Sequence, residues 1–407
     1  MVTLFCFGGC TVKASSKRPQ WLVVAPEIPR FDHAGGDRRL LEILRVVATD
    51  CDVHLLSTSP RQDDDPIYEQ RLQDLGVQLV GRGIRAGISA LVRQRFDVVL
   101  FEFYYTTFRL LRIARRVQPQ ALIVVDSVDL HYLREREAVR LGTWTQEVAA
   151  QTEREELEAY RRADITVAVS YAEQATLQQV GLKSVEVIPI IMEIVDRAKR
   201  GRDPELLFVG GFRHVPNVMA VEWFHRDVWP LVRKRVPAAR WTIAGSKAPP
   251  TVRALHGTDG IQVLGYVPST APLLESAQVS IAPLTFGAGM KSKVCEALAA
   301  GVPVVTTTWG AQGLERGRGD AFLVSDDPTE FADAVVLLLT DAAERTRLGE
   351  GGQRLATQLC STSAAAPGIA ALVARSRQVV GSSLPRRMAA LVSLAAGRAA
   401  GRLRQHR

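Results

Sequence analysis

Short apolar runs separated by helical stretches recur along this chain and constrain its fold more than any other feature. Runs that are apolar at nearly every position are typical of parallel strands buried on both faces of a sheet. The first series comprises Trp21–Ala25, Val53–Leu56, Asp97–Phe101, Ala121–Val125, Ala163–Ser170 and Val185–Ile190. The second comprises Leu206–Val209, Arg240–Ala244, Ile261–Leu264, Val279–Pro283 and Val302–Thr306. The sequence therefore predicts an α/β protein with two parallel sheets.

The two series are divided by the polar segment Ala198–Pro204, which contains glycine and proline. A chain of 407 residues is too long for one ordinary hydrophobic core, so a domain boundary is expected here. We predict an N-terminal extension over 1–19, a Rossmann-like domain over 20–197, a second one over 198–361, and a helix with a basic tail over 362–407. Two such domains in succession place a cleft between them.

The excess positive charge lies at the C-terminal end of the chain. The sequence has 51 Lys and Arg against 43 Asp and Glu, a formal net charge of +8. From Leu355 onward there is no acidic residue. The basic residues there are Arg375, Arg377, Arg386, Arg387, Arg398, Arg402, Arg404 and Arg407. After Gly381 they surround the apolar run Met388–Ala396, which fits either a short anchor on an anionic membrane surface or a solvated basic tail. The tail has no aromatic residue, which argues against a nucleic-acid partner.

Cysteine usage and hydropathy indicate a cytoplasmic protein. The five cysteines are scattered, and the pair Cys6 and Cys10 has no second pair to complete a zinc site. Free thiols fit a reducing compartment. No run reaches the roughly 18–20 apolar residues that cross a bilayer. We expect a protein that needs no metal or cofactor and that associates at most with the inner membrane surface, through the segment 382–407.

The segment Ser280–Thr306 is the most informative about chemistry. A strand is followed by the glycine-containing loop Gly287–Gly289 and then by a helix that carries Lys291, Lys293 and Glu296. Cations near a helix N-terminus are unfavourable unless an anion sits opposite, and a phosphate would satisfy both the lysines and the helix dipole. Glu296 is placed to accept hydrogen bonds from ribose hydroxyls. A surface pair with Lys293 explains it equally well.

A second candidate segment, Leu206–Asn217, has a strand followed by Gly210 and Gly211 and then by Arg213 and His214. Ligands of α/β sheets bind beyond the carboxyl ends of strands, and an arginine there can grip a diphosphate with its forked guanidinium. An arginine in a solvent-facing turn is the alternative.

His131 follows the strand ALIVV and the loop DSVDL, so it lies at the same kind of sheet edge in the first half. A catalytic and a structural role are both open. Asp126 and Asp129 are placed either to orient His131 or to cap the helix that follows.

Several of these motifs together resemble the family 4 glycosyltransferases, retaining enzymes of the GT-B fold with two Rossmann-like domains. The resemblance runs from about residue 20 to 360. In the second half it rests on Phe208–Asn217 (FVGGFRHVPN), Gly245-Ser246, Gly265–Pro268 (GYVP) and Pro283–Gly313. In the first half it rests on Asp32–Arg39 (DHAGGDRR), Asp126–Arg136 (DSVDLHYLRER) and Ala163–Glu173 (ADITVAVSYAE).

The resemblance implies a hexosyltransferase that moves a sugar from a nucleoside diphosphate sugar to a glycan, lipid-linked or other hydroxyl acceptor, as in polysaccharide assembly. The leaving phosphate would take the acceptor's proton, so no protein base is required. The catalytic residues would be Glu296 on the ribose, Arg213 and Lys291 on the diphosphate, and His131 near the sugar. The donor-binding residues would be Gly35, Gly36, Gly210, Gly211, His214, Gly245, Tyr266, Val267, Gly287, Ala288, Gly289, Met290 and Lys293.

The sequence departs from the family pattern at two points. Ala288 stands where a first glutamate is usual, and Asn217–Ala220 offers no lysine to accompany Arg213. A catalytically silent subunit that binds nucleotide sugars, or a nucleotide-sugar epimerase with the same architecture, therefore stays an alternative. The turn APEIPRFDHAGGD lacks the G-x-G-x-x-G fingerprint, and no G-x4-G-K-[ST] occurs, which argues against a dinucleotide-dependent oxidoreductase and a P-loop nucleotidase.

Overall fold

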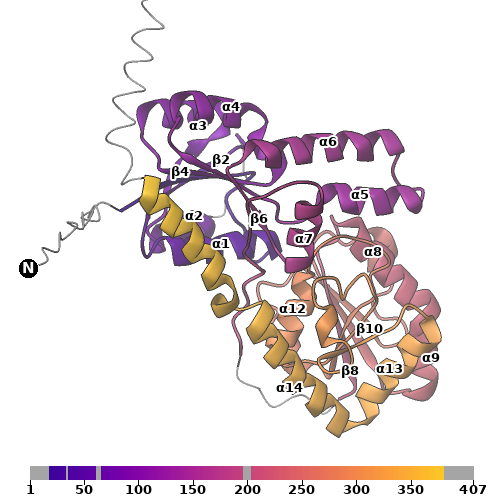
Figure 1. Ribbon diagram of the computed structural model, residues 1–407. Helices are drawn as coiled ribbons and strands as arrows, with labels where there is room; N and C mark the ends of the chain where they lie inside the picture. The colour runs from indigo at the N-terminus through magenta and orange to yellow at the C-terminus, as the bar shows by residue number, and fades with distance from the viewer. Residues whose placement is uncertain (1–17, 34, 61–65, 196–202, 380–407) are drawn as a thin grey trace, which may run out of the picture.

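The computed structural model describes residues 18–33, 35–60, 66–195 and 203–379. These residues form two α/β domains, each built on one parallel sheet, with the second domain below the first in Figure 1. The predicted architecture of two Rossmann-like domains is confirmed. Most of the predicted extension over 1–19, and the basic tail from residue 380 onward, lie outside the described residues.

The first sheet has seven described strands in the order β3-β2-β1-β4-β5-β6-β7, all parallel to their neighbours. Its central strands are buried along their whole length because helices cover both faces. The strands are β1 (Gln20–Ala25), β2 (Asp52–Ser57), β3 (Gln78–Arg82), β4 (Val98–Glu102), β5 (Leu122–Asp126), β6 (Ile165–Ala168) and β7 (Val185–Val187).

Two separate hydrophobic clusters fill the two faces of the first sheet. One cluster joins it to α1 (Gly35–Val47), α2 (Pro66–Asp74) and a helix over residues 362–379. The other joins it to α3 (Gly83–Arg93), η1 (Tyr104–Thr106), α4 (Thr107–Val117), α5 (His131–Arg140), α6 (Gln146–Arg162) and α7 (Tyr171–Gln179). Apolar residues at helical spacing decide which side of each helix faces the sheet, as in α1, where Leu40, Leu41, Leu44 and Val47 are all buried.

The second sheet has six described strands in the order β10-β9-β8-β11-β12-β13, again all parallel. The strand order therefore reverses between β8 and β11. The strands are β8 (Glu205–Val209), β9 (Arg240–Ala244), β10 (Ile261–Gly265), β11 (Val279–Ala282), β12 (Val304–Thr306) and β13 (Phe322–Val324).

The second sheet is also covered on both faces. One cluster packs it against α8 (Val215–Trp223), a π-helical turn (Phe224–Val228), α9 (Trp229–Arg235), α10 (Pro250–Arg253) and α13 (Pro328–Thr340). The other packs it against α11 (Ala271–Ser276), α12 (Ser292–Ala299) and α14 (Ala342–Leu359), with the short helix η3 (Glu315–Gly317) nearby. Asp327 and Asp341 accept hydrogen bonds from the first backbone amides of α13 and α14 and so fix where these helices begin.

The sequence patterns missed some elements. Strand β3 was not predicted, because its sequence QLVGR is half polar and none of its residues is fully buried. The three-residue strand β13 was also missed. Between β8 and β9 the chain forms three consecutive helical segments, α8, the π-helical turn and α9, and Pro230 stands in the first turn of α9.

The helix over residues 362–379 leaves the second domain and packs back onto the first, as the yellow helix in Figure 1 shows. Ala365, Ile369, Leu372 and Val373 are buried in the same cluster as Trp21. Gly368 allows a close approach, because a Cβ there would lie 2.1 Å from the carbonyl oxygen of Val187. Among the described residues, no helix is both long enough and apolar enough to span a membrane.

Candidate functional site

The candidate site lies at the carboxyl ends of β8 and β11, which are neighbours at the point where the order of the second sheet reverses. Ligands of open α/β sheets bind in this crevice. Gly210 and Gly211 follow β8, and the chain there is tightly packed. A Cβ on Gly210 would lie 2.8 Å from Asn217 Nδ2, and a Cβ on Gly245 would lie 2.0 Å from the carbonyl oxygen of Gly210. The lack of side chains lets backbone approach whatever occupies the crevice.

Lys293 lies directly beneath this glycine pair. Its Nζ donates a hydrogen bond to Asn217 Oδ1, lies 4.4 Å from the centre of the Phe208 ring, and is 3.0 Å from the position of a Cβ on Gly210. No carboxylate of the described residues forms an ion pair with it. Burial, and secondly the charge of Lys291, lower the pKa of Lys293 to about 7. The site therefore holds a cation without a counterion, which an anionic ligand would satisfy.

Lys291 turns back into its own loop. Its Nζ donates to the carbonyl oxygens of Ala288, at 2.8 Å, and Gly289, and to Gln312 Oε1 at 3.1 Å. Burial lowers the pKa of Lys291 to about 8, although nearby carboxyl groups oppose the shift. Lys291, which was expected on the helix, is the residue that precedes α12 and has extended backbone. Its contacts show a lysine that fixes the shape of the loop and adds positive charge to it.

Arg213 and His214 lie at the turn before α8, and both are exposed. Arg213 forms no ion pair with the described residues, so its guanidinium is available to a ligand. His214 is the residue before the first turn of α8. Although the residue as a whole is exposed, partial burial of its ring, followed by the charges of Arg134 and Lys293, lowers the pKa of His214 to about 4.

Glu296 connects the two domains. Its Oε1 accepts a hydrogen bond from Arg38 Nη1 of α1 at 2.7 Å and another from Thr270 Oγ1 at 2.8 Å. The carboxylate keeps 18% of its side-chain surface exposed. The alternative of a surface pair with Lys293 is not what the structure has, because Lys293 bonds to Asn217 instead.

The amino ends of α1 and α12 meet across the domain boundary. A Cβ on Gly35 would lie 2.1 Å from Ser292 Oγ and 2.6 Å from Ser292 Cβ. A Cβ on Gly36 would lie 3.3 Å from Val128 Cγ1. Helix amino ends carry free amide donors and a partial positive charge. The glycines thus bring the amino end of α1 close to that of α12, where an anion would be favourable.

The rim of the crevice near β9 and β10 is closed by a contact between the domains. The rings of His33 and Tyr266 stack with centroids 4.7 Å apart, and the Tyr266 hydroxyl donates to Asp32 Oδ2. Val267, the residue after Tyr266, is half-buried. The stacking partner of His33 lies in the other domain and could not be read from the sequence.

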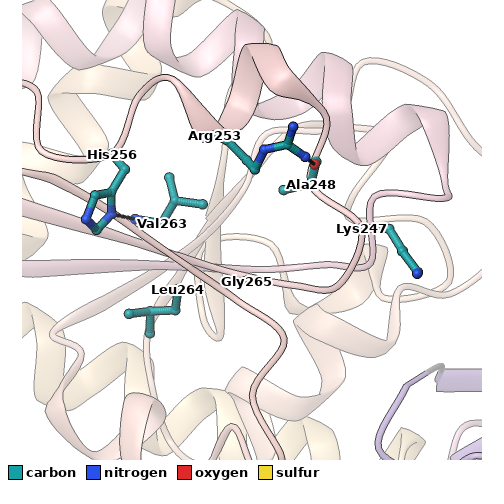
Figure 2. A pocket seen from close by; sticks show the side chains of 7 residues that line it. All are labelled: Lys247, Ala248, Arg253, His256, Val263, Leu264 and Gly265. Carbon is teal, nitrogen blue, oxygen red and sulfur yellow. Dashed lines mark hydrogen bonds between the residues drawn. The ribbon is translucent and has the colours of Figure 1, made fainter.

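A groove of about 520 Å³ opens beside this rim (Figure 2). The Arg253 guanidinium donates to the carbonyl oxygen of Ala248, and the backbone amide of Val263 donates to His256 Nδ1. The first contact is local to the start of α10, and the second joins the segment after α10 to the outer strand β10. The groove is lined by Lys247, Ala248, Arg253, His256, Val263, Leu264 and Gly265. It therefore adjoins Gly245 and Tyr266, two of the residues expected to bind the donor.

His131 is the first residue of α5, and acidic groups surround its ring. Nδ1 lies 3.1 Å from Asp129 Oδ1 and 3.6 Å from Glu156 Oε1. Burial acts to lower the pKa of His131, but the two carboxylates together outweigh burial and raise it above the ordinary value. The rings of Phe103, Tyr104 and Tyr105 stand edge-on to the imidazole. Asp129 thus has the orienting role, one of the two roles open to it.

Neither aspartate of the DSVDL loop caps α5. The carboxylate of Glu156, which is fully buried, accepts from the backbone amides of His131 and Tyr132 at 3.1 and 2.8 Å and from the Tyr160 hydroxyl at 2.7 Å. Asp126 instead pairs with the buried Arg39, at 2.7 Å. The capping group comes from α6, 25 residues further along the chain, where no sequence pattern points to it.

The first domain also contacts the glycine loop before α12. Gly289 has a positive φ of 71°, and a Cβ there would lie 2.8 Å from Glu173 Oε1 and 3.6 Å from Asp129 Cβ. Burial raises the pKa of Glu173 to about 8, and its Oε1 has no hydrogen-bond partner among the described residues. Gly287 and Met290 flank this contact, with Met290 buried. Within the described chain, no three His, Cys, Asp or Glu side chains converge as metal ligands.

The second domain matches a known family. Residues 203–341 match the model described as "Glycosyl transferases group 1". An uncharacterized 44.6 kDa protein in the cps region of Klebsiella pneumoniae is 28% identical over 142 residues. That alignment covers 32% of this chain and 36% of the relative, so the match spans about a third of the relative's length.

Two solved structures are similar over most of the chain. Sucrose-phosphate synthase from Thermosynechococcus elongatus has a TM-score of 0.66 at 14% identity, over 88% of this chain and 98% of its own. HepE of Anabaena, solved in complex with UDP-glucose, has a TM-score of 0.64 at 13% identity, over 87% of this chain and 99% of its own. The chain therefore has the GT-B fold, and its second domain is similar to the group 1 glycosyl transferases.

Proposed function

We propose that this protein is a retaining glycosyltransferase of family 4, which transfers a hexose from a nucleoside diphosphate sugar to a hydroxyl of a glycan or lipid-linked acceptor. One observation carries the proposal. Within the described part of the chain Lys293 has no counterion, and its Nζ lies 3.0 Å from the position of a Cβ on Gly210 at the carboxyl end of β8, near the meeting of the amino ends of α12 and α1. An unpaired lysine beside helix amino ends, at the switch point of a parallel sheet, supports an anion site there.

The charges of the site suit the chemistry of the leaving group. Breaking the bond between the sugar and the diphosphate leaves negative charge on the diphosphate, and preorganised cations and amides stabilise it where it develops. We assign this role to Lys293, to the exposed Arg213 and to the amino end of α12, with Lys291 holding the loop. In this scheme the protein's own cations neutralise the diphosphate, so the proposed reaction needs no metal ion.

Glu296 is the proposed ribose ligand. Both of its hydrogen bonds from protein groups end on Oε1, so Oε2 is left, within the described part of the chain, to accept from ribose hydroxyls. Gly245, Tyr266 and Val267 would border the base. The similarity to a protein crystallised with UDP-glucose makes a UDP-sugar the first donor to test.

The raised pKa of His131 supports a reaction that retains the configuration of the transferred sugar. A raised pKa keeps its imidazole protonated to higher pH than usual, and a protonated imidazole donates hydrogen bonds but does not accept a proton. In the scheme we propose, His131 holds a sugar hydroxyl and the leaving phosphate takes the proton of the acceptor. The cps-region relative supports polysaccharide assembly as the setting.

The test is a thermal-shift panel of UDP-, GDP-, ADP- and TDP-sugars. We expect one nucleotide family to raise the melting temperature of the wild type, and Glu296→Ala to remove most of that rise. Glu275→Ala, on the exposed side of α11, is the matched control and should keep it. The proposal fails if no donor shifts the melting curve.

The fate of the donor, followed with the same purified protein, distinguishes a transferase from a silent binding subunit and from an epimerase. A transferase releases free nucleoside diphosphate slowly from the bound donor even when water is the only acceptor. A silent binding subunit would bind donor without any release. An epimerase would return a changed nucleotide sugar, which chromatography of the donor detects.

A further inference from the structure

The outer face of α3 and α4 is strongly basic and carries almost no acidic residues. Residues 83–117 contain only two carboxylates. Asp97 is bonded to the backbone amide of Gln20 at the start of a strand, and Glu102 is buried at the end of β4. The same segment has seven arginines: Arg85, Arg93, Arg95, Arg109, Arg112, Arg115 and Arg116.

Six of these arginines have no acidic partner among the residues that the structure describes. Arg115 pairs with Asp164 at 2.8 Å, but the other six are exposed and form no ion pair with any residue that the structure describes. The two helices pack side by side on the face of the first sheet that lies away from the second domain (Figure 1). We call this surface the α3–α4 face. Arginines gathered without counterions repel one another, so the arrangement favours an anionic partner.

Aromatic side chains stand exposed at the amino end of α4. Phe108 is 54% exposed and Tyr105 is 37% exposed, so the α3–α4 face combines exposed arginines with two exposed aromatic rings. The exposed rings also contact rings in the interior of the first domain. The Phe108 ring lies 5.8 Å from the Tyr104 ring, which lies 5.3 Å from the imidazole of His131. The α3–α4 face therefore connects directly to the candidate active site through a row of rings.

We propose that the α3–α4 face docks the first domain on an anionic phospholipid membrane, so that a lipid-linked acceptor reaches the cleft along Phe108 and Tyr105. Arginines would contact lipid phosphates, while the exposed rings enter the interface between head groups and acyl chains. Basic residues beside apolar rings are the composition of a surface that lies in the membrane interface, so the proposal commits to the membrane, and binding of a soluble anionic glycan instead is an outcome of the test. The link to the acceptor rests on the proposed function, whereas membrane docking itself does not.

The test is sedimentation of the full chain with vesicles of phosphatidylglycerol mixed with phosphatidylcholine. We expect binding to the mixed vesicles and not to phosphatidylcholine alone. Arg109→Glu with Arg112→Glu should lower the partition coefficient by at least about fivefold for each arginine lost, the effect of about one charge contact per residue. Phe108→Ser, which changes no charge, should lower binding several-fold and should do so even at high salt.

The matched control is Lys234→Glu with Arg354→Glu, which makes the same change in net charge on exposed helix positions of the second domain. It should leave most of the binding intact, and the basic tail is present in every variant. Equal loss in both double variants, or no loss in either, would overturn the proposal. So would binding to a soluble polyanion such as dextran sulfate without binding to vesicles.

The donor thermal shift is measured on the same samples. If the α3–α4 variants keep the donor shift but lose the vesicles, both proposals stand. If the donor shift is absent while vesicle binding depends on the α3–α4 face, the proposed transferase function fails and membrane docking remains.

Discussion

Replacing Gly35 by alanine tests whether the two domains work in the arrangement described. The new Cβ would lie 2.1 Å from Ser292 Oγ and 2.6 Å from Ser292 Cβ. Rotation about χ1 moves the oxygen away but leaves the Cβ in place. Carbon atoms in contact stay about 3.5–4.0 Å apart, so the amino ends of α1 and α12 must separate by about 1 Å.

A misplacement of about 1 Å between groups that hold a substrate can cost on the order of 10²-fold in rate. We therefore expect Gly35→Ala to lower the rate of diphosphate release from the preferred donor by roughly that factor. The melting temperature should change little, because the contact lies between the two domains and not within either hydrophobic cluster. The assay is release of nucleoside diphosphate, followed beside thermal unfolding of the same sample.

A second substitution tests whether the contact between residues 35 and 292 causes the loss of rate. Ser292→Gly removes both atoms that the new Cβ would strike, so Gly35→Ala combined with Ser292→Gly should recover most of the lost rate. A Gly35→Ala variant with wild-type activity would show that this contact is absent from the working enzyme. A double variant as slow as the single one would show that the loss has another cause.

Two further predictions concern buried charge. The pKa of Lys293 is about 7 in the folded protein against 10.5 for a free lysine. Between these two pH values the unfolded chain binds more protons than the folded one. The free energy of unfolding of the ligand-free protein should therefore rise with pH across that range. A diphosphate favours the protonated lysine. Binding of UDP above pH 7 should therefore be accompanied by uptake of protons. Calorimetry in buffers of different ionisation enthalpy measures this uptake. Equal heats of binding in all buffers, or the same uptake in Lys293→Met, would contradict the prediction. Glu156→Ala leaves three hydrogen-bond donors without an acceptor, so it should lower the free energy of unfolding measured in urea by about 3–5 kcal/mol. Glu153 lies in an exposed ion pair, so Glu153→Ala should lower it by less than about 1 kcal/mol. A small loss at Glu156 would mean that it does not hold α5.

The architecture could be predicted from sequence because buried parallel strands leave a strong local signal. Runs such as Trp21–Ala25 are apolar at every position, since both faces of the strand are covered. Strand β3 lies at the edge of its sheet and reads QLVGR, so the signal is lost there. The break between α8 and α9 was also missed, because the apolar spacing of a helix continues across it.

The candidate site could be predicted where its residues share one segment. Lys291, Lys293 and Glu296 lie within six positions of one another, so their closeness follows from the amino end of α12, which Lys291 precedes and which carries the other two. The partners of these residues come from elsewhere. Arg38 is 258 positions from Glu296, and Asn217 is 76 positions from Lys293. Only the packing of the two domains brings such residues together, and no local pattern records it.

The helix over residues 362–379 has a consequence for how the protein is made. It supplies Ala365, Ile369, Leu372 and Val373 to the hydrophobic cluster of the first domain, which also contains Trp21. A ribosome makes these residues after the whole second domain. The second domain is continuous from β8 to α14 and can complete its core as soon as it has left the ribosome, whereas the core of the first domain is complete only once the helix that follows α14 has been made. The usual order of folding during synthesis, amino-terminal domain first, is therefore reversed for the completion of these two cores.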